Sequence, residues 1–201
     1  SAASITVSSP IKAPLGGTPL LRTPRLLLRG LRPSDAPAVA EGSGDIRVAQ
    51  FLTDVPTPYP VEMAAQWIMR RIERGAIGRG PTLAITHADE GPYGHTLGTV
   101  ALRIHKRDQR AELGYWLCAD AWGQGIATEA THALTAWGFG TGLAKIYARV
   151  IAGNAASVRV LTKIGMRQEG LLRNHLRKGN KLLDVLEFGV LASEWPQASA
   201  G

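Results

Sequence analysis

A glycine-rich turn between a strand-like run and a helix-like run constrains the fold of this chain more than any other feature. The turn lies in residues 122–130, which read WGQGIATEA, and it follows the strand-like run 111–117. Glycine allows left-handed backbone and close approach of a ligand. The first N–H groups of a helix lack helical partners, and the helix dipole adds partial positive charge there. This strand–turn–helix unit therefore predicts an anion-binding site, with phosphate as the typical ligand.

Hydrophobic periodicity predicts seven strands and four helices around this unit. Residues 61–74 carry apolar side chains at helical spacing with arginines opposite, and 96–106 alternates between the two faces of a strand. We expect helices at 36–41, 61–74, 124–139 and 155–163, and strands at 25–29, 81–87, 96–106, 110–118, 145–151, 166–172 and 182–191. Residues 42–60 are rich in Pro, Gly and Asp, which favours loop. The order predicts an α+β fold with a mixed, mostly antiparallel sheet.

Composition favours one domain in the cytoplasm, with no metal and no membrane segment. The 201 residues are 45% hydrophobic, enough for a sizeable core. Cys118 is the only cysteine, and no two histidines have metal-ligand spacing, so neither a disulfide framework nor a metal site is expected. No apolar run approaches the ~18 residues that span a bilayer, and no secretion signal is visible.

The charge of the chain is uneven and points to an anionic ligand. The formal net charge is +7, and residues 145–181 contain nine Lys or Arg and one acid, Glu169. A basic surface of this kind attracts anions, although a solvated basic face gives the same pattern. Aromatic residues are too few and scattered for stacking on bases, so nucleic acid is not expected as a partner.

Three further motifs follow one another in a specific order. They are Gly123-Gln124-Gly125-Ile126-Ala127 after a strand, Asn154-Ala155-Ala156-Ser157, and Lys163-Ile164-Gly165-Met166. Their order and spacing resemble those of the GNAT acetyltransferases. The phrases ELGYWL at 112–117 and WGQG at 122–125 are similar to the RimJ/RimL branch, which acetylates the N-termini of ribosomal proteins.

The resemblance covers about residues 20–195 and implies the fold and the cofactor. It implies one acetyltransferase domain at 20–196, between a flexible tail at 1–19 and a C-terminal tail at 197–201. The sheet would have seven strands flanked by helices, with acetyl-CoA in the gap between the fourth and fifth strands. The implied acetyl-CoA-binding residues are Leu117, Cys118, Trp122, Gly123, Gln124, Gly125, Ile126, Ala127, Thr128, Asn154, Ser157 and Lys163.

Two positions depart from the family pattern. Trp122 stands where the family's phosphate motif usually begins with Gln or Arg, so the turn is expected to rely on its backbone donors. Leu161 stands where many relatives carry a tyrosine as general acid, so the acid must come from elsewhere in this chain.

The chemistry of acetyl transfer suggests two catalytic residues. An amine must lose a proton and the leaving thiolate must gain one. Glu112, on the strand that leads to the thioester, is the candidate base, with a salt bridge to Arg103 or Arg110 as the structural alternative. The branch resemblance implies that Ser157 protonates the sulfur, with a role limited to helix capping as the alternative. Cys118 as an acyl carrier is less expected than Cys118 as a small core residue.

The leading hypothesis is an N-acetyltransferase that works by direct attack in a ternary complex, as a monomer or homodimer. The acceptor is expected to be a protein N-terminal amine, with a polyamine, amino acid or antibiotic as alternatives. A non-catalytic acyl-CoA-binding protein is a second alternative, because the tyrosine position is lost. A dinucleotide-binding protein is disfavoured, since Thr128 replaces the third glycine of that motif and 145–150 contains no acid.

Overall fold

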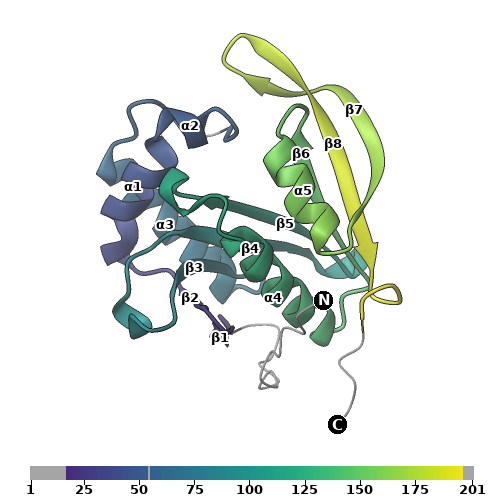
Figure 1. Cartoon of the computed structure of the whole chain (residues 1–201), viewed down its shortest axis with the longest axis horizontal. Helices are drawn as coiled ribbons and strands as arrows, with labels where there is room; N and C mark the ends of the chain where they lie inside the picture. The colour runs from purple at the N-terminus through teal and green to yellow at the C-terminus, as the bar shows by residue number, and fades with distance from the viewer. Residues whose placement is uncertain (1–16, 54, 197–201) are drawn as a thin grey trace.

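The computed structural model describes residues 17–53 and 55–196, which form one eight-stranded sheet flanked by helices (Figure 1). The strand order is β1-β2-β3-β4-β5-β6-β8-β7. All neighbouring strands are antiparallel except β5 and β6, which are parallel. The expected α+β fold with a mixed sheet is confirmed. Most of the expected N-terminal tail (1–16) and the C-terminal tail (197–201) lie outside the described residues.

The elements follow the expected order. The strands are β1 (Leu21–Arg22), β2 (Leu26–Gly30), β3 (Thr82–His87), β4 (Gly98–His105), β5 (Arg110–Leu117), β6 (Lys145–Ile151), β7 (Arg167–Lys178) and β8 (Lys181–Leu191). The α-helices are α1 (Ala36–Gly44), α2 (Ile46–Ala49), α3 (Val61–Ala76), α4 (Ile126–Gly140) and α5 (Ala155–Lys163). Short 3-10 turns lie at Pro33–Asp35, Gly91–Tyr93, Lys106–Asp108 and Ala119–Ala121.

The two faces of the sheet carry different helices. The apolar stripe of α4, including Ile126, Ala130 and Leu134, packs on one face against residues such as Val100 and Leu113. Helices α1 and α3 pack on the other face, in a second cluster that contains Val39, Ile68, Ala84 and Trp116. Figure 1 shows α1 and α3 grouped over β2–β4, with the β7–β8 hairpin at the opposite side of the sheet. Successive strand residues alternate between these faces, which decides where each site residue lies.

The structure corrects the expected element list in three places. The sheet has eight strands because two residues of β1 pair with Leu27 and Leu28 of β2, and two residues are too few to give a periodic signal. The segment 42–60 is not all loop, because α1 runs to Gly44 and α2 follows it. The side chain of Asp45 caps α2 by accepting the backbone N–H of Arg47 at 2.9 Å.

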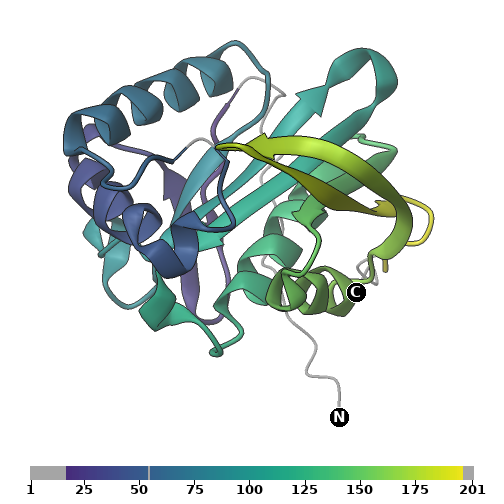
Figure 2. The same ribbon diagram turned by 90° about the horizontal axis from the view of Figure 1, so that it is seen from above.

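The third correction concerns the last hairpin, which is longer than expected. Strand β7 extends to Lys178, six residues beyond the expected end, and irregularities in its pairing with β8 lie between Gln168 and Gly170 and between Leu172 and Leu176. Figure 2 shows the hairpin reaching toward the segment after α2. There the Lys178 ammonium donates hydrogen bonds to the carbonyls of Ala49 and Leu52. The β7–β8 hairpin therefore contacts α2 and the segment that follows it.

Candidate active site

The glycine turn has the conformation that its sequence predicts. After β5 and the 3-10 turn, Gly123 and Gly125 adopt φ values of 74° and 77°. These left-handed values favour glycine strongly. A Cβ added at Gly123 would meet no atom of the protein within 4 Å, so the backbone conformation rather than crowding within the chain requires this glycine.

Backbone N–H groups gather at the start of α4. Gly125 is the N-cap, and its carbonyl accepts the N–H of Glu129 at 3.0 Å. The first helical N–H groups, those of Ile126, Ala127 and Thr128, lie before this bond and have no acceptor within the helix. The start of α4 is therefore able to hold an anion.

Three polar residues that the sequence did not single out, Thr23, Arg25 and Glu129, form hydrogen bonds that support the turn. Buried Glu129 accepts the Thr23 hydroxyl at 2.6 Å and the Arg25 guanidinium at 2.7 Å. Burial raises the pKa of the Glu129 carboxyl, but these hydrogen bonds outweigh it, so the pKa falls below its usual value. Arg25 also donates to the carbonyl of Gln124 at 2.9 Å. Opposite charges in two otherwise apolar segments were the only sequence signal for this contact.

Two side chains of the glycine turn form hydrogen bonds with the end of β5 and with the 3-10 turn that follows it. The indole N–H of Trp122 donates to the carbonyl of Leu117 at 3.0 Å, and the Gln124 amide donates to the carbonyl of Asp120 at 3.0 Å. The indole N–H of Trp122 is therefore used within the turn. This agrees with the expectation that the turn binds an anion through its backbone N–H groups.

Strands β5 and β6 separate at the level of this turn. Their parallel pairing runs from Arg110 with Lys145 to Leu113 with Ala148 and then stops. Beyond it, β5 stays paired with β4, and β6 with β8. The expected gap between the fourth and fifth of the predicted strands is thus present, between β5 and β6.

Backbone groups at the edge of β5 face this gap. The N–H of Cys118 donates to the carbonyl of Leu97 at 2.8 Å, on the side of β4. Because alternate residues of an antiparallel strand address alternate neighbours, the backbone groups of Tyr115 and Leu117 point to the opposite side. The carbonyl of Leu117 accepts Trp122, and its N–H remains at the edge. The amide of Cys118 is therefore already engaged within the sheet.

The Cys118 side chain packs against α1. A Cβ added to Gly42 would lie 2.4 Å from its sulfur, and burial raises the pKa of the thiol. A thiolate is the reactive form of cysteine, so this environment suits the core role rather than acyl transfer.

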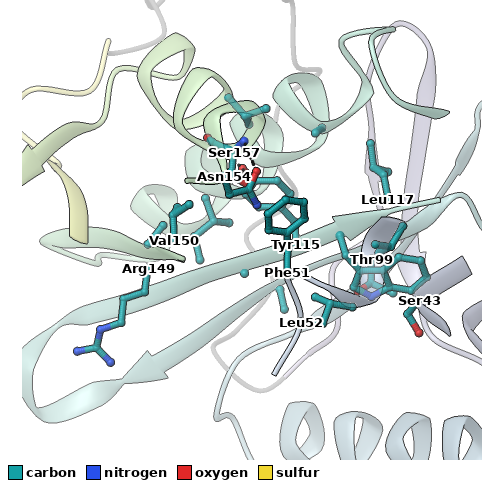
Figure 3. A pocket seen from close by; sticks show the side chains of 18 of the residues that line it. Ser43, Phe51, Leu52, Thr99, Tyr115, Leu117, Arg149, Val150, Asn154 and Ser157 are labelled. Carbon is teal, nitrogen blue, oxygen red and sulfur yellow. Dashed lines mark hydrogen bonds between the residues drawn. The ribbon is translucent and has the colours of Figure 1, made fainter. Parts of the chain in front are cut away.

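Helix α5 begins beside the gap, as its sequence predicts. The Asn154 side chain caps the helix by accepting the N–H of Ser157 at 3.1 Å. The Tyr115 hydroxyl donates to the Ser157 Oγ at 3.1 Å. Burial raises the pKa of Tyr115 to about 12, despite the opposing effect of this hydrogen bond. Figure 3 shows Tyr115 below Asn154 and Ser157.

Two other residues of α5 have different environments. Leu161 is fully buried in the core, so its position offers no group to the gap. Lys163, in the last turn, is exposed and lines the cavity. The hydroxyl groups beside the gap at this level are those of Tyr115 and Ser157, which are hydrogen-bonded to each other.

Glu112 lies on the other face of the sheet from this hydroxyl pair. Its neighbour Leu113 packs against α4, so Glu112 faces the side of α1 and α3. Its carboxylate lies 3.5 Å from the guanidinium of Arg103, which sits opposite it on β4. The expected salt bridge with Arg103 is confirmed, while the side chain still lines the cavity and is 20% exposed.

One cavity of about 840 Å³ joins these parts. Its lining includes the turn and α5 on one face of the sheet and Glu112 on the other, so the cavity passes through the gap between β5 and β6. Figure 3 shows Leu117, Tyr115, Asn154 and Ser157 around this opening. The site residues expected from the sequence that line it are Glu112, Leu117, Trp122, Gly123, Gly125, Ile126, Ala127, Thr128, Asn154, Ser157 and Lys163. Cys118 and Gln124 are next to it in the chain but do not line it.

Within 17–53 and 55–196, no three His, Cys, Asp or Glu side chains form a group that could hold a metal ion. No helix in that part of the chain is long and apolar enough to cross a membrane.

Comparison with known proteins identifies the class that this fold and site define. Residues 25–167 match the family model described as an acetyltransferase (GNAT) domain. The chain therefore belongs to the GNAT acetyltransferase family, and the resemblance in the sequence is confirmed.

Similar proteins cover nearly the whole chain. An uncharacterized N-acetyltransferase, p20 of Bacillus licheniformis, is 30% identical over 179 residues, which are 87% of this chain and 97% of the relative. Mycobacterium smegmatis RimJ in complex with CoA-disulfide superposes with a TM-score of 0.76 and 24% identity, over 96% of this chain and 90% of that one. RimL, a ribosomal L7/L12 α-N-protein acetyltransferase in complex with coenzyme A, gives 0.75 and 21%, over 84% and 94%. These structures share the fold of this chain.

Proposed function

We propose that this protein transfers an acetyl group from acetyl-CoA to the N-terminal α-amine of a protein. The observation that carries the proposal is the cavity that passes through the sheet between β5 and β6. It joins the start of α4 and the hydroxyl pair on one face to a carboxylate on the other. A thioester in the gap would be open to an amine from the Glu112 face.

The residues around the gap fit the parts of acetyl-CoA. The N–H groups of 123–128 and the dipole of α4 suit a pyrophosphate. The free edge of β5 at Leu117 suits the amide-bearing pantetheine arm, as an added strand would. The side-chain oxygen of Asn154 is used in the helix cap, which leaves the NH₂ of its side-chain amide as a donor. Lys163 adds a cation at the cavity wall. Gln124 would contribute its backbone N–H and not its side chain. Cys118 only follows Leu117 in the chain, and its side chain does not line the cavity.

Glu112 and Ser157 have complementary roles in this proposal. The amine must lose a proton as it attacks the carbonyl carbon. Glu112 lines the cavity, with its carboxylate 3.5 Å from the Arg103 guanidinium. The departing thiolate must gain a proton, and the Ser157 hydroxyl is the candidate donor. Since neutral Tyr115 donates to the Ser157 oxygen, the serine proton is free to point elsewhere. A base and an acid on opposite faces suit direct attack.

A protein N-terminus is the acceptor that these residues support best. A model α-amine has a pKa of about 7.7–8.0 and a lysine amine about 10.4, so an α-amine needs less help to become neutral. A carboxylate is in general a weaker base than either amine, which suits the substrate that loses its proton more easily. The names of the RimJ and RimL structures, which share this fold, agree with this class.

The test measures binding and transfer separately. Calorimetry with acetyl-CoA tests cofactor binding, and mass spectrometry with a panel of peptides and small amines tests transfer. Peptides acetylated at the α-amine support the proposal. Turnover of small amines alone would contradict the protein acceptor, and binding without thiol release would indicate a non-catalytic acyl-CoA-binding protein.

A matched pair of variants tests the base. Glu112→Gln should lower turnover at neutral pH and leave acetyl-CoA affinity unchanged. Glu187→Gln is the control, because Glu187 pairs with Arg149 at 3.0 Å but does not line the cavity. Equal turnover in the two variants would remove Glu112 from the mechanism.

A further inference from the structure

The acceptor side of the cavity has a surplus of arginines. Resting on the proposed function, we propose that the acceptor is an acidic amine: an N-terminus whose first residues carry carboxylates. Among the residues that the structure describes, seven Arg or Lys side chains and one carboxylate, that of Glu112, line the cavity. Arg159 and Lys163 belong to α5, on the side of the coenzyme. The other five, on α3, the loop that follows it, β4 and β6, are Arg71, Arg74, Arg79, Arg103 and Arg149.

These arginines meet on the face of the sheet that carries Glu112. The carbonyl of Arg79 accepts the N–H of Ile104, so Arg79 lies beside Arg103. Arg103 faces Glu112 across the β4–β5 ladder. Arg149 is on the same face of β6, because its neighbours Ala148 and Val150 pack in the core below α4. The charges therefore surround the side from which an amine would approach the gap.

The arginines keep capacity for a ligand. Arg103 is 50% exposed although it pairs with Glu112, and Arg149 is 37% exposed although it pairs with Glu187. No ion pair involves Arg74 or Arg79 among the residues that the structure describes. A guanidinium has five N–H donors in a fork that fits a carboxylate, so one bound carboxylate does not exhaust it.

The other described residues of this wall carry no negative charge. Apolar and aromatic side chains, Val48, Phe51, Leu52, Trp67 and Trp116 among them, make up much of it. Polyamines and other polycations would meet five arginines and, among the described lining residues, the single carboxylate of Glu112, which is unfavourable. A positive surrounding also lowers the pKa of a bound amine, because it disfavours the ammonium form. The same charges thus select acidic acceptors and help the reacting amine to be neutral.

The experiment compares peptides that differ only in charge. Ser-Ala-Glu-Asp-Glu-Ala, Ser-Ala-Gln-Asn-Gln-Ala and Ser-Ala-Lys-Arg-Lys-Ala share the reacting residue, and free glutamate and spermidine test small amines. We expect kcat/KM to fall in the order acidic, neutral, basic, with about tenfold between the first and last, as two exposed ion pairs would give. Added salt should narrow the difference. Equal rates, or a preference for the basic peptide or spermidine, would overturn the inference. Turnover of glutamate equal to that of the acidic peptide would keep the preference for an acidic amine but contradict the requirement for a protein N-terminus.

Charge reversal identifies the responsible side chains. Arg79→Glu and Arg74→Glu should reduce or reverse the preference for the acidic peptide. Arg22→Glu is the matched control, because Arg22 is exposed on β1 at the other edge of the sheet. Binding of the same peptides, followed by tryptophan fluorescence, separates the two proposals. Selective binding of the acidic peptide without transfer would contradict the proposed function alone, whereas transfer or binding regardless of charge would contradict the acidic acceptor.

Discussion

The hydroxyl of Tyr115 on β5 donates a hydrogen bond of 3.1 Å to the Oγ of Ser157 on α5, beside the gap between β5 and β6. Tyr115 stays neutral over the working pH range, because burial raises its pKa to about 12. It therefore remains a donor, and it holds the serine oxygen in place while the serine proton stays free for another acceptor. The pair joins two elements that no backbone hydrogen bond connects at this level of the sheet.

Tyr115→Phe tests this positioning role. Removing the phenol hydroxyl deletes one hydrogen bond worth about 1 kcal/mol, so we expect kcat to fall about fivefold with acetyl-CoA affinity unchanged. Steady-state kinetics and calorimetry measure the two quantities. Tyr147→Phe is the control, because the Tyr147 hydroxyl contacts His105 at 3.3 Å and lies outside the cavity. In a Ser157→Ala background, Tyr115→Phe should have little further effect. A full fivefold loss there would contradict the coupling.

Gly125→Glu tests the anion cradle. A left-handed conformation costs a non-glycine residue about 1–2 kcal/mol, and the new carboxylate would lie beside the N–H groups of α4. We expect acetyl-CoA binding to be lost by calorimetry. Gly142→Glu, after the end of α4, has the same backbone cost at φ 95° with open space around it. It should lower the free energy of unfolding by a similar amount and keep binding. Loss of binding in both variants would mean that stability, rather than the cradle, explains the effect.

The sequence predicts the fold wherever a local pattern is long enough. Helices α3 and α4 each have an apolar stripe, and every expected strand is present, with at least five residues in each. The two residues of β1 and the four of α2 are too short for such a pattern. The expected strand ends at residue 172, whereas β7 continues beyond an irregularity to Leu176, Arg177 and Lys178, which pair with β8.

The same limit applies to the candidate site: residues that act through local backbone geometry can be predicted from the sequence, and contacts between distant residues cannot. Gly123, Gly125 and Asn154 could be assigned from the sequence, because each acts through its local backbone geometry. The contacts between Tyr115 and Ser157 and between Arg25 and Glu129 depend on pairing across 42 and 104 positions. No local pattern encodes such distances, so neither contact can be predicted from the sequence.

The ion pair between Arg29 and Asp35 predicts how stability depends on pH. The Asp35 carboxylate accepts two bonds from Arg29, at 2.8 and 2.9 Å, and one from Thr96. Burial raises the pKa of Asp35, but these bonds outweigh it and the pKa is lowered. A lowered pKa stabilises the fold above the unfolded value of about 3.9, and this contribution is lost as the pH falls through the folded value.

Asp35→Asn should therefore lower the free energy of unfolding at pH 7 by about 3–5 kcal/mol, as for one partner of a buried pair. It should also flatten the acid limb of the stability curve below pH 4. Urea titrations at a series of pH values measure both effects. Asp108→Asn, at an exposed pair with Arg110, should change the curve little. An acid limb in Asp35→Asn as steep as in the unmodified protein would refute the assignment.

The Lys178 contact predicts that the hairpin and the segment after α2 open together. Its ammonium is bonded to the carbonyls of Ala49 and Leu52, and charged hydrogen bonds are worth about 1.5–3 kcal/mol. Lys178→Met should speed amide hydrogen exchange about tenfold in both the hairpin tip and residues 49–52. Lys181→Met, at an exposed neighbour on the same hairpin, should leave both segments as they were. Faster exchange in the hairpin tip alone would show that the contact does not couple the two segments.

Leu161→Tyr asks whether the missing family tyrosine limits this enzyme. Leu161 is fully buried and packs with residues such as Ile126 and Ile164, so a larger, polar side chain has no space there. Overpacking costs about 1–3 kcal/mol, and a buried hydroxyl without a partner adds to that cost. We expect a lower melting temperature and no gain in kcat, because the hydroxyl would not reach the gap without displacing α5. Leu161→Met, which conserves volume, should retain both stability and kcat. A rise in kcat for Leu161→Tyr would mean that α5 can move, and it would transfer the role of proton donor from Ser157 to position 161.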